Sequence, residues 1–225
     1  YCREQIRNGT TGHFTLDGLT PYMRYSFAGG NDGVSENAAA WSADYTFNER
    51  ALVEMLGRSQ DSMMAERPPR DGHRKTILDP HATHVGIGLA WEKGEFRLVQ
   101  EFVRRYVDWT RPVPRQARVG DGVTLAGKAH SGLRVDAITV HHERFPAALT
   151  AQAASAIDTY SLPDARREYL PRLRSNVTRP HDGTLVVEQR LYENGHRGDF
   201  YTGSDGTFTF DMPFPDGPGI YTVVV

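Results

Sequence analysis

A proline-rich stretch at residues 110–115, Thr-Arg-Pro-Val-Pro-Arg, divides the chain into two halves with different sequence patterns. Before it, apolar residues recur at both helical and strand spacing. After it, short alternating runs are separated by clusters of Gly and Pro. Proline at this density is typical of a connection between domains. We therefore predict two domains, residues 1–109 and 117–225, joined by a linker at residues 110–116.

Composition excludes several classes of protein. The 225 residues are 39% hydrophobic and 24% charged, which is typical of globular domains and not of disordered, collagen-like or coiled-coil chains. Lys and Arg (26 residues) nearly balance Asp and Glu (28 residues), so no overall basic field points to nucleic acid. The longest apolar stretches, such as residues 85–91, are far shorter than the roughly 20 residues that span a bilayer. We predict no nucleic-acid partner and no transmembrane segment.

The first half is predicted to mix helix and strand. Asn48 can cap a helix that ends before Pro68. Its apolar residues share one face at helical spacing, and they are Leu52, Met55, Leu56 and Met63. Residues 84–90 and 96–103 are rich in β-formers and are separated by a short segment that contains Gly94, which predicts a hairpin.

The second half is predicted to form a small β-sandwich. The expected strands are residues 119–129, 135–141, 185–192, 207–212 and 221–225. Residues 147–156 are expected to form a short helix, and residues 161–180 an irregular crossover. The last two runs resemble the final strands of immunoglobulin-like or carboxypeptidase-regulatory-like modules, although the same alternation is common to many sandwiches.

The most specific local pattern lies at residues 71–80 and 83–90, which are DGHRKTILDP and THVGIGLA. It places His73 on a Gly loop ahead of a strand in which Gly86 and Gly88 allow close approach of another backbone. This pattern resembles the CAP superfamily (SCP-like; cysteine-rich secretory, antigen 5, pathogenesis-related), in its bacterial extracellular branch. The family signature there is G-H-R-x-x-I-L followed by T-x-x-G-x-G-x-A.

Two further segments carry the same resemblance in the expected order. Residues 13–24 are similar to the H-x-x-x-D-G-x-T-P-x-x-R segment, and residues 35–39 are similar to the G-E-N-I-A motif, with Ser35 in place of Gly. The helix after Asn48 follows them. Four ordered motifs across residues 1–109 are much harder to obtain by chance than one. The resemblance implies that a first helix is missing before Tyr1, and Cys2 is then expected to be a small buried thiol and not a nucleophile.

The resemblance also implies a fold and a site. The expected fold class is α+β, with an α-β-α sandwich followed by the all-β sandwich. The implied site is a cleft lined by two histidines and two acidic residues, which binds zinc or another divalent cation in some family members. His13 and His73 match the positions of the metal ligands, and Glu36 matches the first acid.

The second acid is less clear from the resemblance. Glu66 lies three residues after Met63, within about 40° of the buried stripe of the helix, whereas Glu54 projects from the opposite face. We prefer Glu66 and keep Glu54 in reserve. Neutral imidazoles can hold zinc while carboxylates orient a histidine or accept a proton from bound water, so Glu36 and Glu66 are the candidate catalytic residues.

These features favour a binding or assembly component of the cell envelope, in which the His/Glu cleft is able to bind a divalent cation. The extracellular or periplasmic location rests on the family resemblance alone. A non-catalytic role is preferred, and the expected partner is a protein or an envelope component. Three alternatives stay open: a metal-dependent hydrolase of peptide or cell-wall substrates, a carrier of an apolar ligand such as a lipid or sterol, and a scaffolding subunit of a larger complex.

Overall fold

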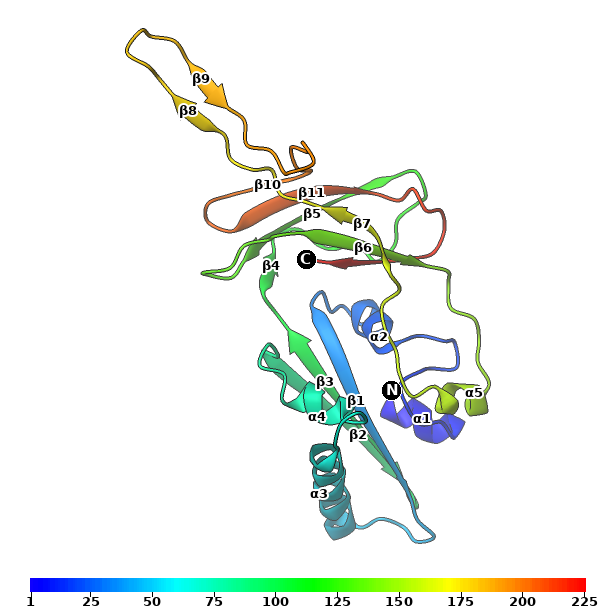
Figure 1. Ribbon diagram of the computed structural model, residues 1–225. Coiled ribbons are helices and arrows are strands. Elements are labelled where there is room, and N and C mark those ends of the chain that lie inside the picture. The colour runs from blue at the N-terminus through cyan, green and yellow to red at the C-terminus, as the bar shows by residue number, and fades with distance from the viewer. The chain divides into compact units, whose positions relative to one another are not determined.

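The structure is a computed structural model that describes residues 1–225 and contains two compact units (Figure 1). The first unit consists of Tyr1–Arg105 and Pro146–Ser161, and the second consists of Tyr106–Phe145 and Leu162–Val225. This division differs from the predicted one because Pro146–Ser161 returns to the first unit. The stretch predicted as a linker lies within the second unit, directly after a strand at Val107–Trp109.

The predicted fold class, α+β with an α-β-α sandwich, is wrong. The chain is mostly β, with 33% strand and 19% helix, and it forms four small antiparallel sheets and only five short helices. Three of the four helices in Tyr1–Arg105 have six or seven residues, so each is about 10 Å long at 1.5 Å per residue. The strands beside them have nine or ten residues and extend about 30 Å. Strand therefore outweighs helix, and the predicted α-β-α sandwich is not formed.

The first unit is organised around one three-stranded antiparallel sheet of order β1-β3-β2. Its strands are β1 (Gly33–Ser42), β2 (His84–Glu92) and β3 (Glu95–Arg104). The predicted β2–β3 hairpin is confirmed, and its turn consists of Lys93 and Gly94. β3 is the central strand and carries the deepest core residues of this unit, Phe96 and Leu98.

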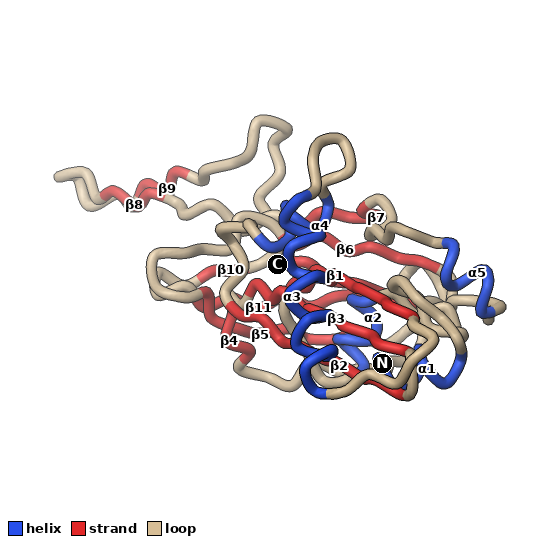
Figure 2. Tube along the Cα trace, turned by 90° about the horizontal axis from the view of Figure 1, so that it is seen from below, coloured by secondary structure: helices blue, strands red, loops and turns tan.

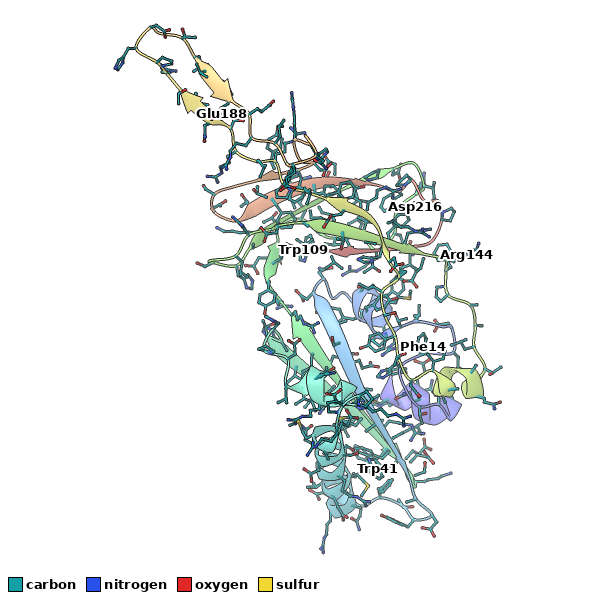
Figure 3. The ribbon with its side chains drawn as sticks, viewed as in Figure 1. Phe14, Trp41, Trp109, Arg144, Glu188 and Asp216 are labelled. Carbon is teal, nitrogen blue, oxygen red and sulfur yellow. The ribbon has the colours of Figure 1, made fainter.

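Helices contact this sheet from two sides (Figures 1 and 2). They are α1 (Cys2–Asn8), α2 (Pro21–Phe27), α3 (Glu49–Ala65) and α4 (Gly72–Ile77). The predicted helix after Asn48 is confirmed as α3, because the Asn48 side chain accepts a hydrogen bond from the Ala51 N–H at 2.9 Å. α3 packs on Phe96 and Leu98, and Trp41 of β1 donates to Ser59 of α3 at 2.8 Å (Figure 3).

The first helix brings the single cysteine against the other face of the sheet. Cys2 is 7% exposed and packs with Ala90 and Val99. Its Sγ donates to the carbonyl of Gly88 at 3.3 Å. The prediction of a small buried thiol is therefore confirmed, and burial raises the pKa of this thiol above its ordinary value.

The second unit contains two antiparallel sheets that share one hydrophobic core. One has the order β10-β11-β5-β4, from Tyr201–Thr202, Thr207–Pro213, Gly122–Ala129 and Val107–Trp109. The other has the order β12-β6-β7, from Ile220–Val224, Ile138–Glu143 and Ala165–Tyr169. β11 alternates buried and exposed residues, so Phe208, Phe210 and Met212 enter the core while the residues between them face outward.

Two segments of the second half depart from the predicted elements. Residues 161–180, expected to be irregular, contain β7 and also β8 (Asn176–Thr178), which pairs with β9 (Val186–Glu188). The β8–β9 hairpin projects from its unit, and Glu188 marks it in Figure 3 (Figures 1 and 3). The expected short helix is present as α5 (Ala151–Ala156), but it belongs to the first unit. None of the helices is long and apolar enough to cross a membrane.

Candidate functional site

The predicted residues His13 and Glu36 lie together against the sheet of the first unit. Glu36 projects from β1 with a side chain that is 0% exposed, and His13 Nδ1 donates to its Oε1 at 2.8 Å. Arg24 of α2 donates to the other carboxylate oxygen of Glu36 and to the carbonyl of His13. The guanidinium also lies over the ring of Tyr1, with Cζ 3.7 Å from the ring centroid. Arg24 therefore links the His13 loop, α1 and β1 around one buried carboxylate.

A second carboxyl group, which sequence reasoning missed, completes this cluster. Glu101 of β3 is the cross-strand partner of Glu36, and Arg24 Nη2, which donates to Glu36, lies 3.9 Å from Glu101 Oε1. Burial raises the pKa of both groups, and together with the charge of Glu36 it raises the pKa of Glu101 to about 9. Glu101 is therefore protonated at neutral pH.

The electrostatics of the cluster also keep His13 uncharged. Burial, followed by the nearby charge of Arg24, lowers the pKa of His13 to about 4. At neutral pH the ring is therefore a neutral imidazole that donates its Nδ1 proton to Glu36. In this cluster Arg24 therefore faces a neutral His13 and a protonated Glu101, and its guanidinium donates to Glu36.

The other two predicted residues, Glu66 and His73, form a separate pair. Glu66 directly follows α3, and its carboxylate accepts from His73 Nδ1 at 2.5 Å and from the backbone N–H of His73 at 3.0 Å. Burial opposes ionisation of Glu66, but hydrogen bonds from His73 and Arg74 outweigh it and lower its pKa. Glu54, the reserve candidate, has a side chain that is 61% exposed and faces Arg58 on the surface of α3.

The two His/Glu pairs lie over opposite faces of the sheet. Asn37 donates to the carbonyl of His73 at 3.1 Å, whereas the adjacent Glu36 contacts His13. Consecutive residues of a strand project to opposite faces, so β1 separates the two histidines. No group of three or more His, Cys, Asp or Glu side chains in the chain is arranged to hold a metal ion. The zinc site that the resemblance implies at His13 and His73 stays a prediction.

A segment remote in sequence covers the Glu36 cluster. Within Pro146–Ser161, Tyr160 packs edge-on against His13 with ring centroids 5.0 Å apart, and its hydroxyl accepts from the backbone N–H of Glu36. α5 is attached to the loop that carries His13, because the Ser155 hydroxyl accepts from the Thr11 N–H at 3.1 Å. Burial raises the pKa of Tyr160 to about 12, so this hydroxyl stays protonated.

The same segment makes close contact with the turn before α2. The Leu149 N–H donates to the carbonyl of Leu16 at 2.7 Å. Gly18 has a φ of 80°, and a Cβ at this position would lie 2.5 Å from the carbonyl oxygen of Ala147. Glycine is therefore required there for both its backbone conformation and its lack of a side chain.

Replacing Tyr160 by Phe tests this cover. The variant leaves the buried Glu36 N–H without its acceptor, so we expect a loss of about 1–3 kcal/mol in the free energy of opening at β1. Native-state hydrogen exchange of the Glu36 amide measures this loss directly. Tyr45→Phe is the matched control, because Tyr45 is 53% exposed and packs on Phe47 through its ring. Equal exchange rates in both variants would show that Tyr160 does not hold this edge.

The hollows on the surface of the first unit lie elsewhere. One of about 470 Å³ is lined by Arg3, Ile6 and Arg7 of α1 and by residues 89–92 of β2. Another is lined mainly by residues 74–80 together with Asp71 and Arg104. Neither includes a residue of the Glu36 cluster. The Glu36 cluster therefore lies apart from both hollows, and Glu101 Oε2 within it has no hydrogen-bond partner.

Two comparisons of the chain with known proteins found no relative. No protein-family model matches the chain, and a search of curated proteins gave no match.

Proposed function

We propose that this chain is an assembly protein that binds a protein partner along the open edge of β2. The observation that carries this proposal is a row of large apolar side chains on that strand, Val85, Ile87, Leu89 and Trp91, called here the β2 apolar row. Their exposed fractions lie between 39% and 63%. Contiguous exposed apolar residues of this size are typical of interaction surfaces, whereas isolated ones need no explanation.

The β2 apolar row extends the core of the first unit outward. Leu89 is the cross-strand partner of Leu98, and Trp91 is the cross-strand partner of Phe96, so the row shares a face with the buried residues of β3. α3 packs on Phe96 and Leu98 but leaves β2 uncovered. A partner on β2 would therefore bury apolar surface that continues an existing core.

The edge of β2 also offers free backbone groups. The Glu36 N–H points away from β3, because it donates to Tyr160 at the opposite edge of the sheet. Glu101 of β3 pairs with Glu36, so in a regular antiparallel ladder the N–H and C=O of Glu101 also point away from β1 and toward β2. On β2 the residue opposite Glu101 is Gly86. Even-numbered residues of β2 consequently bond to β3. The odd-numbered residues of the β2 apolar row turn their N–H and C=O outward, as strand addition requires.

The His/Glu residues support this role by holding the first unit together. Glu36 is fully buried, its carboxylate accepts from His13 and Arg24, and Glu101 is its cross-strand partner. These groups join β1, β3, α2 and the His13 loop into one rigid support for the sheet. The cell-envelope location, the divalent cation and the CAP membership stay predictions from the sequence.

A paired substitution tests the proposed function. The full chain is immobilised, and proteins of the source cells that it retains are identified by mass spectrometry for the wild type and for Ile87→Lys/Leu89→Lys. We expect the specifically retained proteins to be lost from the double variant, since two charges would be buried in the interface. Val53→Lys is the control, because Val53 is 65% exposed on α3 and lies outside the row. Identical retention by all three proteins would overturn the proposal.

A further inference from the structure

We propose that the strand which β2 binds is β2 of a second copy of this chain, in antiparallel register centred on Gly88. This inference rests on the proposed function and names its partner. A two-fold axis at Gly88 would join two three-stranded sheets into one sheet of six strands. Two observations carry the proposal. The order of the nine residues of β2 is self-complementary, and the outer edge of this strand has no feature that prevents pairing.

The centred register pairs like with like along the strand. Ile87 faces Leu89 of the second copy, and Val85 faces Trp91 of the second copy, so the two β2 apolar rows meet on one face. These odd-numbered residues are the ones whose N–H and C=O groups point outward. The register therefore satisfies the backbone groups and buries the apolar side chains with the same alignment.

Charge complementarity selects this register over its neighbours. His84 and Glu92 are the first and last residues of β2, and both are exposed. Centring on Gly88 places His84 opposite Glu92 of the second copy at each end of the paired strands, where the imidazole can donate to the carboxylate. A shift by two residues in either direction keeps the backbone pattern but moves Glu92 opposite Ala82 or Gly86, so both ends lose their partners.

β2 also lacks the features that keep edge strands apart. It contains no Pro and no Lys, and its pairing with β3 runs without a bulge. The other edge of the sheet is different, because the Tyr160 hydroxyl hydrogen bonds with both the N–H and the C=O of Glu36 on β1. Gly86 has no need of glycine within its own chain, since a Cβ there would meet no atom within 4 Å and its φ is not positive. Close approach of a second backbone accounts for glycine at this place.

The first test is the mass of the particle in solution. Sedimentation velocity of the full chain at tens of micromolar should show a dimer for the wild type and for Val53→Lys. Ile87→Lys/Leu89→Lys should raise the dissociation constant by roughly 100-fold or more, because each lysine would face the other copy's lysine across the two-fold axis. A wild-type monomer under these conditions would overturn the proposal.

The second test reads the register. Ile87→Cys and Leu89→Cys are made as single variants and oxidised separately and as an equal mixture. In the centred register position 87 faces position 89 of the other copy, so only the mixture should form a disulfide-linked dimer. Within either variant alone the two cysteines lie diagonally, about 7–8 Å apart between Cα atoms, which is too far for a relaxed disulfide. The wild type, with its buried Cys2, is the blank.

The outcomes separate this inference from the proposed function. Cross-linking that is equal in the single variants and in the mixture would show a different register and overturn the Gly88-centred dimer. A monomeric wild type whose retained protein is a different molecule, lost in Ile87→Lys/Leu89→Lys, would overturn the dimer and leave the proposed function intact. If no variant loses partner binding or self-association, both the proposed function and the Gly88-centred dimer are overturned.

Discussion

Replacing Arg24 by Met is expected to destabilise the first unit by about 3–5 kcal/mol, because it removes one partner of a buried ion pair and leaves the other without compensation. Arg24 donates to Glu36, whose side chain is 0% exposed, and to the carbonyls of His13 and Leu19. Methionine keeps much of the side-chain volume, so packing against Tyr1 changes little. The loss therefore reports the charge and its hydrogen bonds.

Native-state hydrogen exchange of the β3 amides measures this effect, since those amides report opening of the first unit alone. Arg58→Met is the matched control, because Arg58 is 55% exposed and lies over the ring of Trp41 on the surface of α3. It should cost less than about 1 kcal/mol. Adding Glu36→Gln to Arg24→Met should recover part of the loss, because no uncompensated carboxylate then remains. A loss for Arg24→Met no larger than that of the control would contradict the central role assigned to the guanidinium.

The free energy of opening of the first unit is expected to fall as the pH rises from about 6.5 to 9. The pKa of Glu101 is raised from 4.5 to about 9 in the folded protein, so the folded state binds more protons than the unfolded state in this range. The stabilisation is complete below the unfolded pKa and is lost as the pH rises through the folded pKa. One proton corresponds to about 1.4 kcal/mol per pH unit, an upper figure because the Glu101 side chain is 27% exposed.

His13 has the opposite effect on the acid side. Its pKa is lowered from 6.5 to about 4, so stability is complete above pH 6.5 and is lost as the pH falls toward 4. Between pH 4.5 and 6.5 the contributions of His13 and Glu101 oppose each other, and the profile should be nearly flat there. The clear signal therefore lies on the alkaline side.

Hydrogen exchange of the β3 amides at several pH values, corrected for intrinsic rates, measures this profile. Glu101→Gln should remove the decline between pH 6.5 and 9, because glutamine cannot release a proton. His13→Asn serves as the companion variant, which should keep the alkaline decline and lose the acid one. Parallel alkaline profiles for the wild type and Glu101→Gln would show that Glu101 does not hold this proton.

Local patterns in the sequence were sufficient for the elements whose contacts are mostly within themselves. The Asn48 cap and the spacing of Met55 and Met63 define α3, and the two β-rich runs around Gly94 define the β2–β3 hairpin. Motif matching placed His13, Glu36, Glu66 and His73 in one cleft, whereas the structure joins His13 to Glu36 and Glu66 to His73 as two separate pairs. Each of these inferences depends on residues close in sequence or on a recurring motif.

The fold class was predicted wrongly, because it depends on contacts that local sequence patterns do not reveal. A resemblance in motifs implied helical layers, but layer formation depends on helix length and on which strand faces each helix covers. α3 packs on Phe96 and Leu98 of β3 and leaves the β2 apolar row on the same face exposed. Glu101 was missed although a charged residue within the apolar run 96–103 was visible, because its meaning depends on its pairing with Glu36.

The sequence by itself therefore determined the hairpin, the capped helix and the buried cysteine. Only the tertiary structure decided that β1 pairs with β3, which sets Glu36 beside Glu101, and that Pro146–Ser161 returns to place Tyr160 on this cluster. It also decided that the two histidines lie on opposite faces of one sheet. The physical reason is that strand pairing joins residues far apart in sequence, and their shifted pKa values and burial arise only from that contact.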